Sequence, residues 1–514
     1  MGANIVEWVK RTATVSMEVN DSISDEQNAV IKQLNDEWNC FSDLDKKRIV
    51  SIFDNNFESN DLIYIYSVMA KGIEFSYFSN SLLKALVNSD YDGYFGSFLE
   101  YQTYLLPEAD YSLRTRFHDK NVNSLINGWD LKYDYIPMAQ RDKNKIVIFT
   151  EQLLGERHAP SLIVLRTAYA LQKYLNYDVT IFSCPIIARV PDKVWFKSGV
   201  ENHLEEQEGR VCKREYMGEF LKVYQVSLGS ACDFKEIKMM YDLIYAWKPL
   251  FVCSMGSLNP VIDIASSFVT EVNSTFAEKV PMTSSQILLM DINELVTESN
   301  KVIKDYQKAV LVDNVRPFFK KSEVVLTKEG IGLSESAYTI AIVGNRLDKE
   351  IDKPFADAVS EAMKSCGSIN VLIFGNAVQC LELFDEEIRD RIHNIGYCED
   401  LMAAYTIIDL YVNPVRMGGG YSAAMALASG IPVVSLKDCD VHSHCGDRFA
   451  VADLDDMKNT IIRYVEDEEF AAEKYSAAEV FKNENSEERY FERLSESLKH
   501  IIDEVHIYTE EHEK

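Results

Sequence analysis

Two cations placed three residues apart could bind a phosphorylated ligand. Arg346 and Lys349 follow the apolar run YTIAIVG at residues 338–344, where a buried strand is expected to end. An arginine presents a planar fork of donors and a lysine a mobile point charge, so together they could neutralise a diphosphate. For this pair taken alone, two solvated surface cations are the more ordinary explanation. Other parts of the sequence must decide between the two.

Three consecutive glycines offer a second anion-binding feature. Gly418, Gly419 and Gly420 precede a segment of small residues that is expected to begin a helix near Tyr421 and Ser422. Glycines let a phosphate approach the backbone, and a helix N-terminus adds free N–H groups and a favourable dipole. The run matches neither GxxxxGK[ST] nor GxGxxG. A structural turn explains one glycine, whereas three in this place favour anion binding.

Polar residues also follow two earlier strand candidates. His158 lies after the run at residues 145–150, directly before a helix that a proline would open, and could act as a general base at neutral pH. The alternative, a histidine that caps the helix or makes a structural hydrogen bond, is more common for a lone histidine. Ser257 and Asn259 follow the run at residues 249–254 and are suited to hydrogen-bond hydroxyl groups, although this signal is weak.

A cluster of metal-ligand residue types is present but poorly spaced. Cys439, His442, His444 and Cys445 fall within seven residues. Structural zinc sites separate paired ligands by two residues or more, a pattern that this segment does not follow. We therefore predict no metal site, and expect a loop after the strand that ends near Leu436, with one histidine facing the functional site.

Composition limits the classes of partner. The chain has 514 residues, with 53 Lys and Arg against 81 Asp and Glu, a formal net charge of −28. This balance argues against nonspecific binding to nucleic acid or to an anionic membrane surface. No apolar stretch approaches the roughly 20 residues that span a bilayer. The ten cysteines are dispersed and include no CxxC pair, so we expect reduced thiols and a cytoplasmic location.

The elements that position these residues form three predicted domains. Residues 1–140 are expected to be a helical accessory domain, with Ser24 and Gln27 as a capping box and Ser42 as a second cap. Residues 141–315 and 316–514 each alternate apolar strand candidates with helices, which predicts two doubly wound parallel sheets and an α/β fold class. A long amphipathic helix is expected to close the chain at residues 486–508. The strand candidates are residues 145–150, 178–182, 222–226, 249–254, 338–344, 370–375, 391–397, 408–414 and 431–436.

Taken together, these features resemble the GT-B glycosyltransferases over residues 145–510. The resemblance rests on two Rossmann-like halves, the cationic pair, and the glycine turn that leads through a helix to GIPVV at residues 430–434. It implies two such domains facing a cleft, with the last helix as the crossover helix of the fold. More specifically, the chain resembles the branch of O-GlcNAc transferase and the bacterial adhesin N-glucosyltransferases, whose members also carry a helical N-terminal domain.

The resemblance assigns roles to three of the residues above. A histidine lies after the first strand of the N-terminal half in that branch, and His158 matches it. A lysine after the first strand of the C-terminal half contacts the nucleotide diphosphate, and Lys349 matches that lysine, with Arg346 at a second contact position. Retaining GT-B enzymes have a similar pair, so the pair indicates the fold and not the stereochemistry.

Further residues are assigned by resemblance to the rest of the donor. The turn that holds the diphosphate and ribose matches residues 418–422. The segment IGYCED at residues 395–400 is similar to the family stretch whose backbone reads the base, which makes Gly396 and Tyr397 candidates. The chain departs from the family at Met425, where an acidic residue usually binds the ribose, because a thioether is a poor acceptor for hydroxyl groups.

The function that the resemblance implies is glycosyl transfer. The expected reaction moves a sugar from a nucleotide sugar, with UDP favoured, to a protein or glycan acceptor without a bound metal or other cofactor. The alternative is a catalytically inert GT-B subunit that binds and stabilises an active partner through its helical N-terminal domain, which Met425 motivates. A GT-B epimerase is disfavoured because no additional carboxylates for the sugar can be located.

Overall fold

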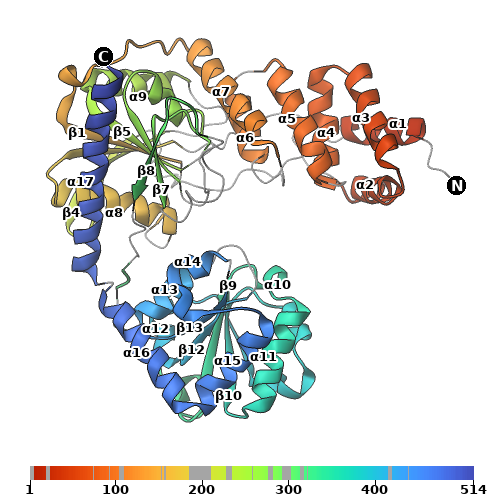
Figure 1. Ribbon diagram of the computed structural model, residues 1–514, viewed down its shortest axis with the longest axis vertical. Helices are drawn as coiled ribbons and strands as arrows, with labels where there is room; N and C mark the ends of the chain where they lie inside the picture. The colour runs from red at the N-terminus through yellow and green to blue at the C-terminus, as the bar shows by residue number, and fades with distance from the viewer. Residues whose placement is uncertain are drawn as a thin grey trace. The chain divides into compact units, whose positions relative to one another are not determined.

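The chain divides into two compact units, each described here by itself. The first unit comprises Met1–Asp313 and Ser495–Lys514, and the second comprises Asn314–Leu494. Figure 1 shows the ribbon. The computed structural model describes residues 5–18, 24–72, 75–91, 93–103, 109–151, 153–155, 158–184, 210–226, 234–256, 259–275, 282–291, 303–312, 318–320, 322–414, 420–437, 439–484 and 486–513.

Helices form the N-terminal part of the first unit, as predicted. Ser24 and Gln27 make the expected capping box at the second helix, and Ser42 accepts a backbone N–H at the start of the third. Tyr66, Phe78 and other aromatic side chains of this region are buried in its core. The helices are α1 (Ile5–Glu18), α2 (Asp25–Trp38), α3 (Asp43–Asn56), α4 (Ser59–Gly72), α5 (Phe75–Asn88), α6 (Gly93–Thr103) and α7 (Tyr111–Gly128).

An eight-stranded sheet forms the rest of the first unit, in the order β3-β4-β2-β1-β5-β6-β7-β8. Its neighbouring strands are parallel except for the hairpin of β3 and β4. The four strands predicted in this region are confirmed as β1, β2, β4 and β5. The strands are β1 (Asp142–Thr150), β2 (Asp178–Ser183), β3 (Arg210–Tyr216), β4 (Glu219–Gln225), β5 (Pro249–Met255), β6 (Glu271–Ser274), β7 (Ile287–Asp291) and β8 (Lys308–Val312).

Two α-helices and a short 3₁₀ segment connect these strands in the described residues. Helix α8 (Ala159–Lys173) follows β1 and has its proline in the first turn, as predicted. Helix α9 (Phe234–Trp247) precedes β5. Between β5 and β6 the described residues form a 3₁₀ segment, η3 (Ile262–Ser267).

The second unit holds a six-stranded sheet that is parallel throughout, in the order β11-β10-β9-β12-β13-β14. The five strands predicted here are confirmed, and the structure adds β14. The strands are β9 (Tyr338–Gly344), β10 (Ile369–Gly375), β11 (Ile392–Gly396), β12 (Leu410–Val412), β13 (Val433–Leu436) and β14 (Ala450–Val451).

Helices cover both faces of this second sheet. On one face, Ile340 and Ile342 of β9 pack in one core with α11 and α15, and on the other, Ala341 and Val343 pack with α13 and α16. Burial on both faces explains why β9 is apolar along its whole length. The helices are α10 (Leu347–Glu350), α11 (Lys353–Ser365), α12 (Leu401–Ala404), α13 (Gly420–Ala428), α14 (Asp440–Cys445), α15 (Leu454–Glu466) and α16 (Glu468–Glu484).

The last helix, α17 (Glu487–His512), begins in the second unit and ends in the first. Within the first unit, Thr509 Oγ1 lies 2.9 Å from Thr270 Oγ1, and Lys308 pairs with Glu504 at 2.5 Å. Residues 495–514 were expected with the second α/β domain, whereas they lie in the first compact unit. The predicted boundary at residues 140/141 stays a prediction. Among the residues described, no helix is both long enough and apolar enough to cross a bilayer.

Candidate functional site

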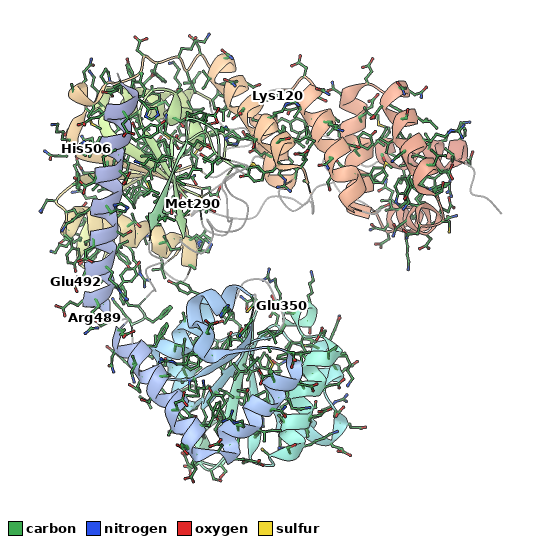
Figure 2. The ribbon with its side chains drawn as sticks, in the orientation of Figure 1. Lys120, Met290, Glu350, Arg489, Glu492 and His506 are labelled. Carbon is green, nitrogen blue, oxygen red and sulfur yellow. The ribbon has the colours of Figure 1, made fainter. Side chains whose placement is uncertain are left out.

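The predicted cations lie on the loop that follows β9. Arg346 is the residue before α10, and Lys349 lies within that helix. The guanidinium of Arg346 contacts Glu350 Oε1 through both Nε and Nη2 at 3.0 Å. The side chain of Arg346 is 65% exposed and that of Glu350 only 9%. Figure 2 labels Glu350 beside the second sheet. The arginine is therefore accessible, with a carboxylate as a competitor for any anion.

A carboxylate between the two cations joins this loop to the next one. Asp348 Oδ1 accepts the backbone N–H groups of Val378, Gln379 and Cys380 at 2.8, 2.8 and 3.0 Å. The backbone hydrogen bonds from Cys380 and Val378 hold the pKa of Asp348 below its usual value. Sequence reasoning did not single out Asp348. Its partners lie 30 to 32 residues away, so no local pattern indicates the contact.

A glycine allows the ends of β9 and β10 to meet. Gly375 pairs with Gly344 in the register of the two strands and has φ +121°. A Cβ at Gly375 would lie 1.9 Å from the Gly344 carbonyl oxygen, closer than any side chain can approach. Only glycine fits both the backbone conformation and the close approach. This position, too, was not singled out from the sequence.

The predicted base-reading segment lies at the end of β11. Gly396 has φ +77°, and the neighbouring Tyr397 is 66% exposed. Asn394 donates from Nδ2 to the Ala377 carbonyl at 2.5 Å, which ties the end of β11 to the loop after β10. Asp348 thus joins the loop after β9 to the loop after β10, and Asn394 joins that loop to the end of β11.

The glycine run leads into a helix, as predicted. Gly418 and Gly419 lie outside the described residues, and α13 begins at Gly420. Ser422 Oγ lies 2.9 Å from the hydroxyl of Tyr411, so this side chain already has a partner within the protein. The ring of Tyr421 packs edge-on against Phe319.

Small residues let α13 lie close to the sheet, and Met425 lies among them. Ala423, Ala424 and Ala426 are buried. Met425 is partly buried and packs against the apolar core on this face of the sheet. Helix α13 itself contains no acidic side chain.

His158 occupies the N-cap position of α8 in the first unit, but its side chain does not cap the helix. Its Nδ1 lies 2.8 Å from the hydroxyl of the buried Ser161, which also accepts the Leu154 N–H at 2.7 Å. Burial lowers the pKa of His158, which favours the neutral ring. In the tautomer with the proton on Nδ1, Nε2 can accept a proton.

Two polar residues, Ser257 and Asn259, were predicted after β5 to hydrogen-bond hydroxyl groups. Ser257 lies outside the described residues. Asn259 is 1% exposed, donates to the Cys184 carbonyl at 2.9 Å and accepts the Val261 N–H at 3.1 Å. Its amide ties the loop after β5 to the end of β2, and its expected hydrogen bond to a substrate hydroxyl stays a prediction.

Glu151 is a carboxylate at this edge that sequence reasoning missed. It is the first residue after β1, and a Cβ at Gly256, which follows β5, would lie 2.8 Å from its Cδ. Gly256 has φ +128°, so glycine is required there in any case. The available signal was its position directly after a buried strand.

The cysteine- and histidine-rich segment forms the short helix α14, which corrects the expectation of a loop. His442 Nε2 lies 3.0 Å from Asp447 Oδ1, and Cys439 Sγ lies 3.0 Å from Ser435 Oγ. In the part of the chain that the structure describes, no three His, Cys, Asp or Glu side chains are grouped to hold a metal ion.

Comparison with known proteins identifies the matched family and the fold. Residues 337–467, about a quarter of the chain, match the family Glycosyl transferases group 1. The O-GlcNAc transferase of Thermobaculum terrenum is similar in structure, with a TM-score of 0.54 and 11% identity over 99% of both chains. No curated protein sequence matches the chain.

Two further solved structures are less similar. A glycosyltransferase of Rickettsia africae has a TM-score of 0.49 and 13% identity, over 71% of this chain and 99% of its own. The sucrose-phosphate synthase of Thermosynechococcus elongatus has a TM-score of 0.48 and 12% identity, over 71% of this chain and all of its own. Residues 337–467 therefore match a glycosyltransferase family, and the chain has the GT-B fold, as the sequence predicted.

Proposed function

We propose that this enzyme transfers a sugar from a UDP-sugar to a protein or glycan acceptor, without a bound metal ion. The observation that carries the proposal is the accessible pair of Arg346 and Lys349 after β9, inside the domain that matches the glycosyl transferases. The O-GlcNAc transferase of similar fold supports an N-acetylhexosaminyl donor.

In the proposed reaction, the second unit stabilises the leaving group. When the glycosidic bond breaks, negative charge grows on the departing diphosphate. Lys349 and Arg346 supply cations for that charge, and the N-terminus of α13 supplies backbone N–H donors and a favourable dipole. Gly396 and Tyr397 hold the base. These groups take the place of a metal ion as electrostatic stabilisers.

In this proposal the first unit supplies the general base for the acceptor. His158 is held through Nδ1 by Ser161, and burial favours its neutral form. In this form Nε2 accepts the proton that the acceptor loses as it attacks the anomeric carbon.

The proposed location is the cytosol, and it is supported by the free thiols of all cysteines that the structure describes.

Nucleotide binding and slow donor hydrolysis test the proposal. UDP or a UDP-sugar should raise the melting temperature of the wild-type protein, because a ligand that binds only the folded state stabilises it. UDP release from the preferred donor should fall by at least about a hundredfold in Lys349→Ala, which removes stabilisation of the transition state. Lys353→Ala is the matched control, because Lys353 is an exposed lysine of the same unit that pairs with Asp357.

The outcome also separates the proposal from its alternative. If no nucleotide sugar binds at millimolar concentration, the transferase proposal fails. If UDP binds and no donor is ever hydrolysed or transferred, the chain is better described as an inert subunit that stabilises a partner. Met425 favours that second function, since it packs on the apolar core and offers no carboxylate to a ribose.

The contact of Arg346 with Glu350 predicts a gain of affinity. Glu350→Gln should strengthen UDP binding about twofold at low ionic strength, because an i, i+4 ion pair contributes about 0.3–0.5 kcal/mol and competes with the ligand. Isothermal titration at 20 and 300 mM salt measures the effect, which screening should diminish. In an Arg346→Ala background the gain should shrink, and an equal gain there would show that Arg346 does not contact the donor.

A further inference from the structure

The loop that carries the cations has little structure of its own. Helix α10 has only four residues, fewer than an isolated helix needs for stability. The main chain of this loop is anchored at one end by β9, where Gly375 permits the close approach of β10 to Gly344. Leu347 and Ile351 are buried in the core and hold this loop against the sheet, but its placement relative to the loop after β10 needs a second anchor.

Asp348 provides that second anchor. Its Oδ1 accepts hydrogen bonds from three successive N–H groups of the loop after β10, those of Val378, Gln379 and Cys380. A single carboxylate oxygen that accepts three backbone hydrogen bonds is a strong, charge-assisted contact. In the same loop Ala377, the residue before Val378, accepts a hydrogen bond at its carbonyl from Asn394, two residues before Gly396.

The large sequence separation between Asp348 and its hydrogen-bond partners distinguishes it from the helix-capping aspartates of the same unit. Asp352 and Asp453 each accept an N–H from the residue three positions ahead, at the start of their own helices. Asp348 instead bonds residues 30 to 32 positions away, on a neighbouring strand's loop. Its contact is therefore one between loops, and it stabilises the relative placement of the predicted diphosphate and base segments.

We propose that Asp348 is a positioning residue of the donor site, which holds Lys349 at a defined distance from the segment at Gly396 and Tyr397. This inference rests on the proposed function. It also explains how an acidic residue is tolerated between two cations that must bind an anion. The three N–H groups offset the charge of the carboxylate, so that the carboxylate fixes the loop with less repulsion of the diphosphate.

The test compares the affinities of UDP and uridine by isothermal titration. In Asp348→Ala, the affinity for UDP should fall about 10- to 100-fold, because a displacement near 1 Å is enough to misalign a charged contact. The affinity for uridine, which lacks the diphosphate, should change by less than about threefold. Asp348→Asn keeps an acceptor oxygen without the charge and should recover part of the loss.

A double variant and a control exclude a merely structural role. If Asp348 acts through Lys349, then Asp348→Ala combined with Lys349→Ala should bind UDP no more weakly than Lys349→Ala alone. Asp453→Ala removes a local cap elsewhere in the unit and should lower its melting temperature without changing the ratio of the two affinities. Should Asp348→Ala fail to fold, Asp348→Asn carries the same comparison.

The outcomes distinguish the inference from the function beneath it. If the wild-type protein binds UDP and Asp348→Ala binds it equally well, the positioning role is wrong while the donor site stands. An equal loss of UDP and uridine affinity would also overturn the role, because it would indicate general damage to the unit. If the wild-type protein binds no UDP, the proposed function fails and this inference with it.

Discussion

Replacing His118 with alanine is expected to lower the free energy of unfolding of the first unit by about 3–5 kcal/mol, because it leaves buried carboxylates without their cation. His118 on α7 is 1% exposed. Its Nδ1 lies 2.6 Å from Glu100 of α6, and its Nε2 lies 2.8 Å from Asp263 of η3. Glu271, also fully buried, has its pKa raised by burial and by Asp263, which favours its neutral form.

The stabilisation should depend on pH with a defined sign. Burial by itself would lower the pKa of His118, but Glu100 and Asp263 outweigh it and raise the value to about 10. A folded-state pKa above the unfolded one means that the stabilisation is complete below about pH 6.5. It is then lost as the pH rises toward 10. The difference between wild type and His118→Ala should therefore be larger at pH 6 than at pH 9.5.

Urea unfolding of the full chain, monitored by the transition of the first unit, measures the difference in free energy of unfolding between wild type and His118→Ala. His393→Ala is the control, because His393 is a partly exposed histidine of the second unit whose Nε2 lies 3.2 Å from the amide oxygen of Asn370. It should change stability by less than about 1 kcal/mol. A loss below that value in His118→Ala, or one that grows with pH, would contradict the buried ion pairs.

Replacing Gly375 with alanine is the second large effect that the structure predicts. The added methyl group would lie 1.9 Å from the Gly344 oxygen and 2.6 Å from its carbonyl carbon. Both atoms belong to the backbone of the neighbouring strand and cannot rotate away, and the φ of +121° adds strain to any other residue. We expect a loss of about 3 kcal/mol or more in the second unit.

The same change should disable donor binding in whatever fraction still folds. Separation of β9 from β10 would move the loop that carries Lys349, so UDP affinity should fall with stability. Thermal unfolding and UDP titration measure the two effects. Gly367→Ala is a matched control in the turn before β10, since its Cβ would meet no atom within 4 Å, and it should change stability by less than about 1 kcal/mol. A wild-type melting temperature for Gly375→Ala would refute the argument.

The strands that sequence reasoning found share one property. The run at residues 338–344 was predicted with the bounds of β9 because both faces of that strand are buried and every residue is apolar or small. Local caps such as Ser24 with Gln27 were found for a similar reason, since the contact joins residues three positions apart. In both cases the information lies within one short segment.

Three of the strands that were missed lack such a segment, whereas β7, of sequence ILLMD, is an apolar run that the prediction overlooked. β3 is an edge strand of sequence RVCKREY, whose charges resemble those of a surface loop. β6 has only four residues, two of which are the buried polar side chains of Glu271 and Asn273. β8 has five residues, of which only Val310 is buried. Each pairs with a neighbour that the sequence does not indicate, and that pairing is what makes it a strand.

By itself, the sequence determined the alternation of strands and helices, the fold class, and the placement of His158, Arg346 and Lys349 directly after strands. These follow from hydrophobic periodicity, which is a local property of the chain. Only the tertiary structure decided what those side chains contact. Asp348 with its three N–H donors, Gly375 against Gly344, and His118 between two acids all join positions far apart in the sequence. Such contacts depend on which strands and helices lie side by side, and no spacing along the chain encodes that.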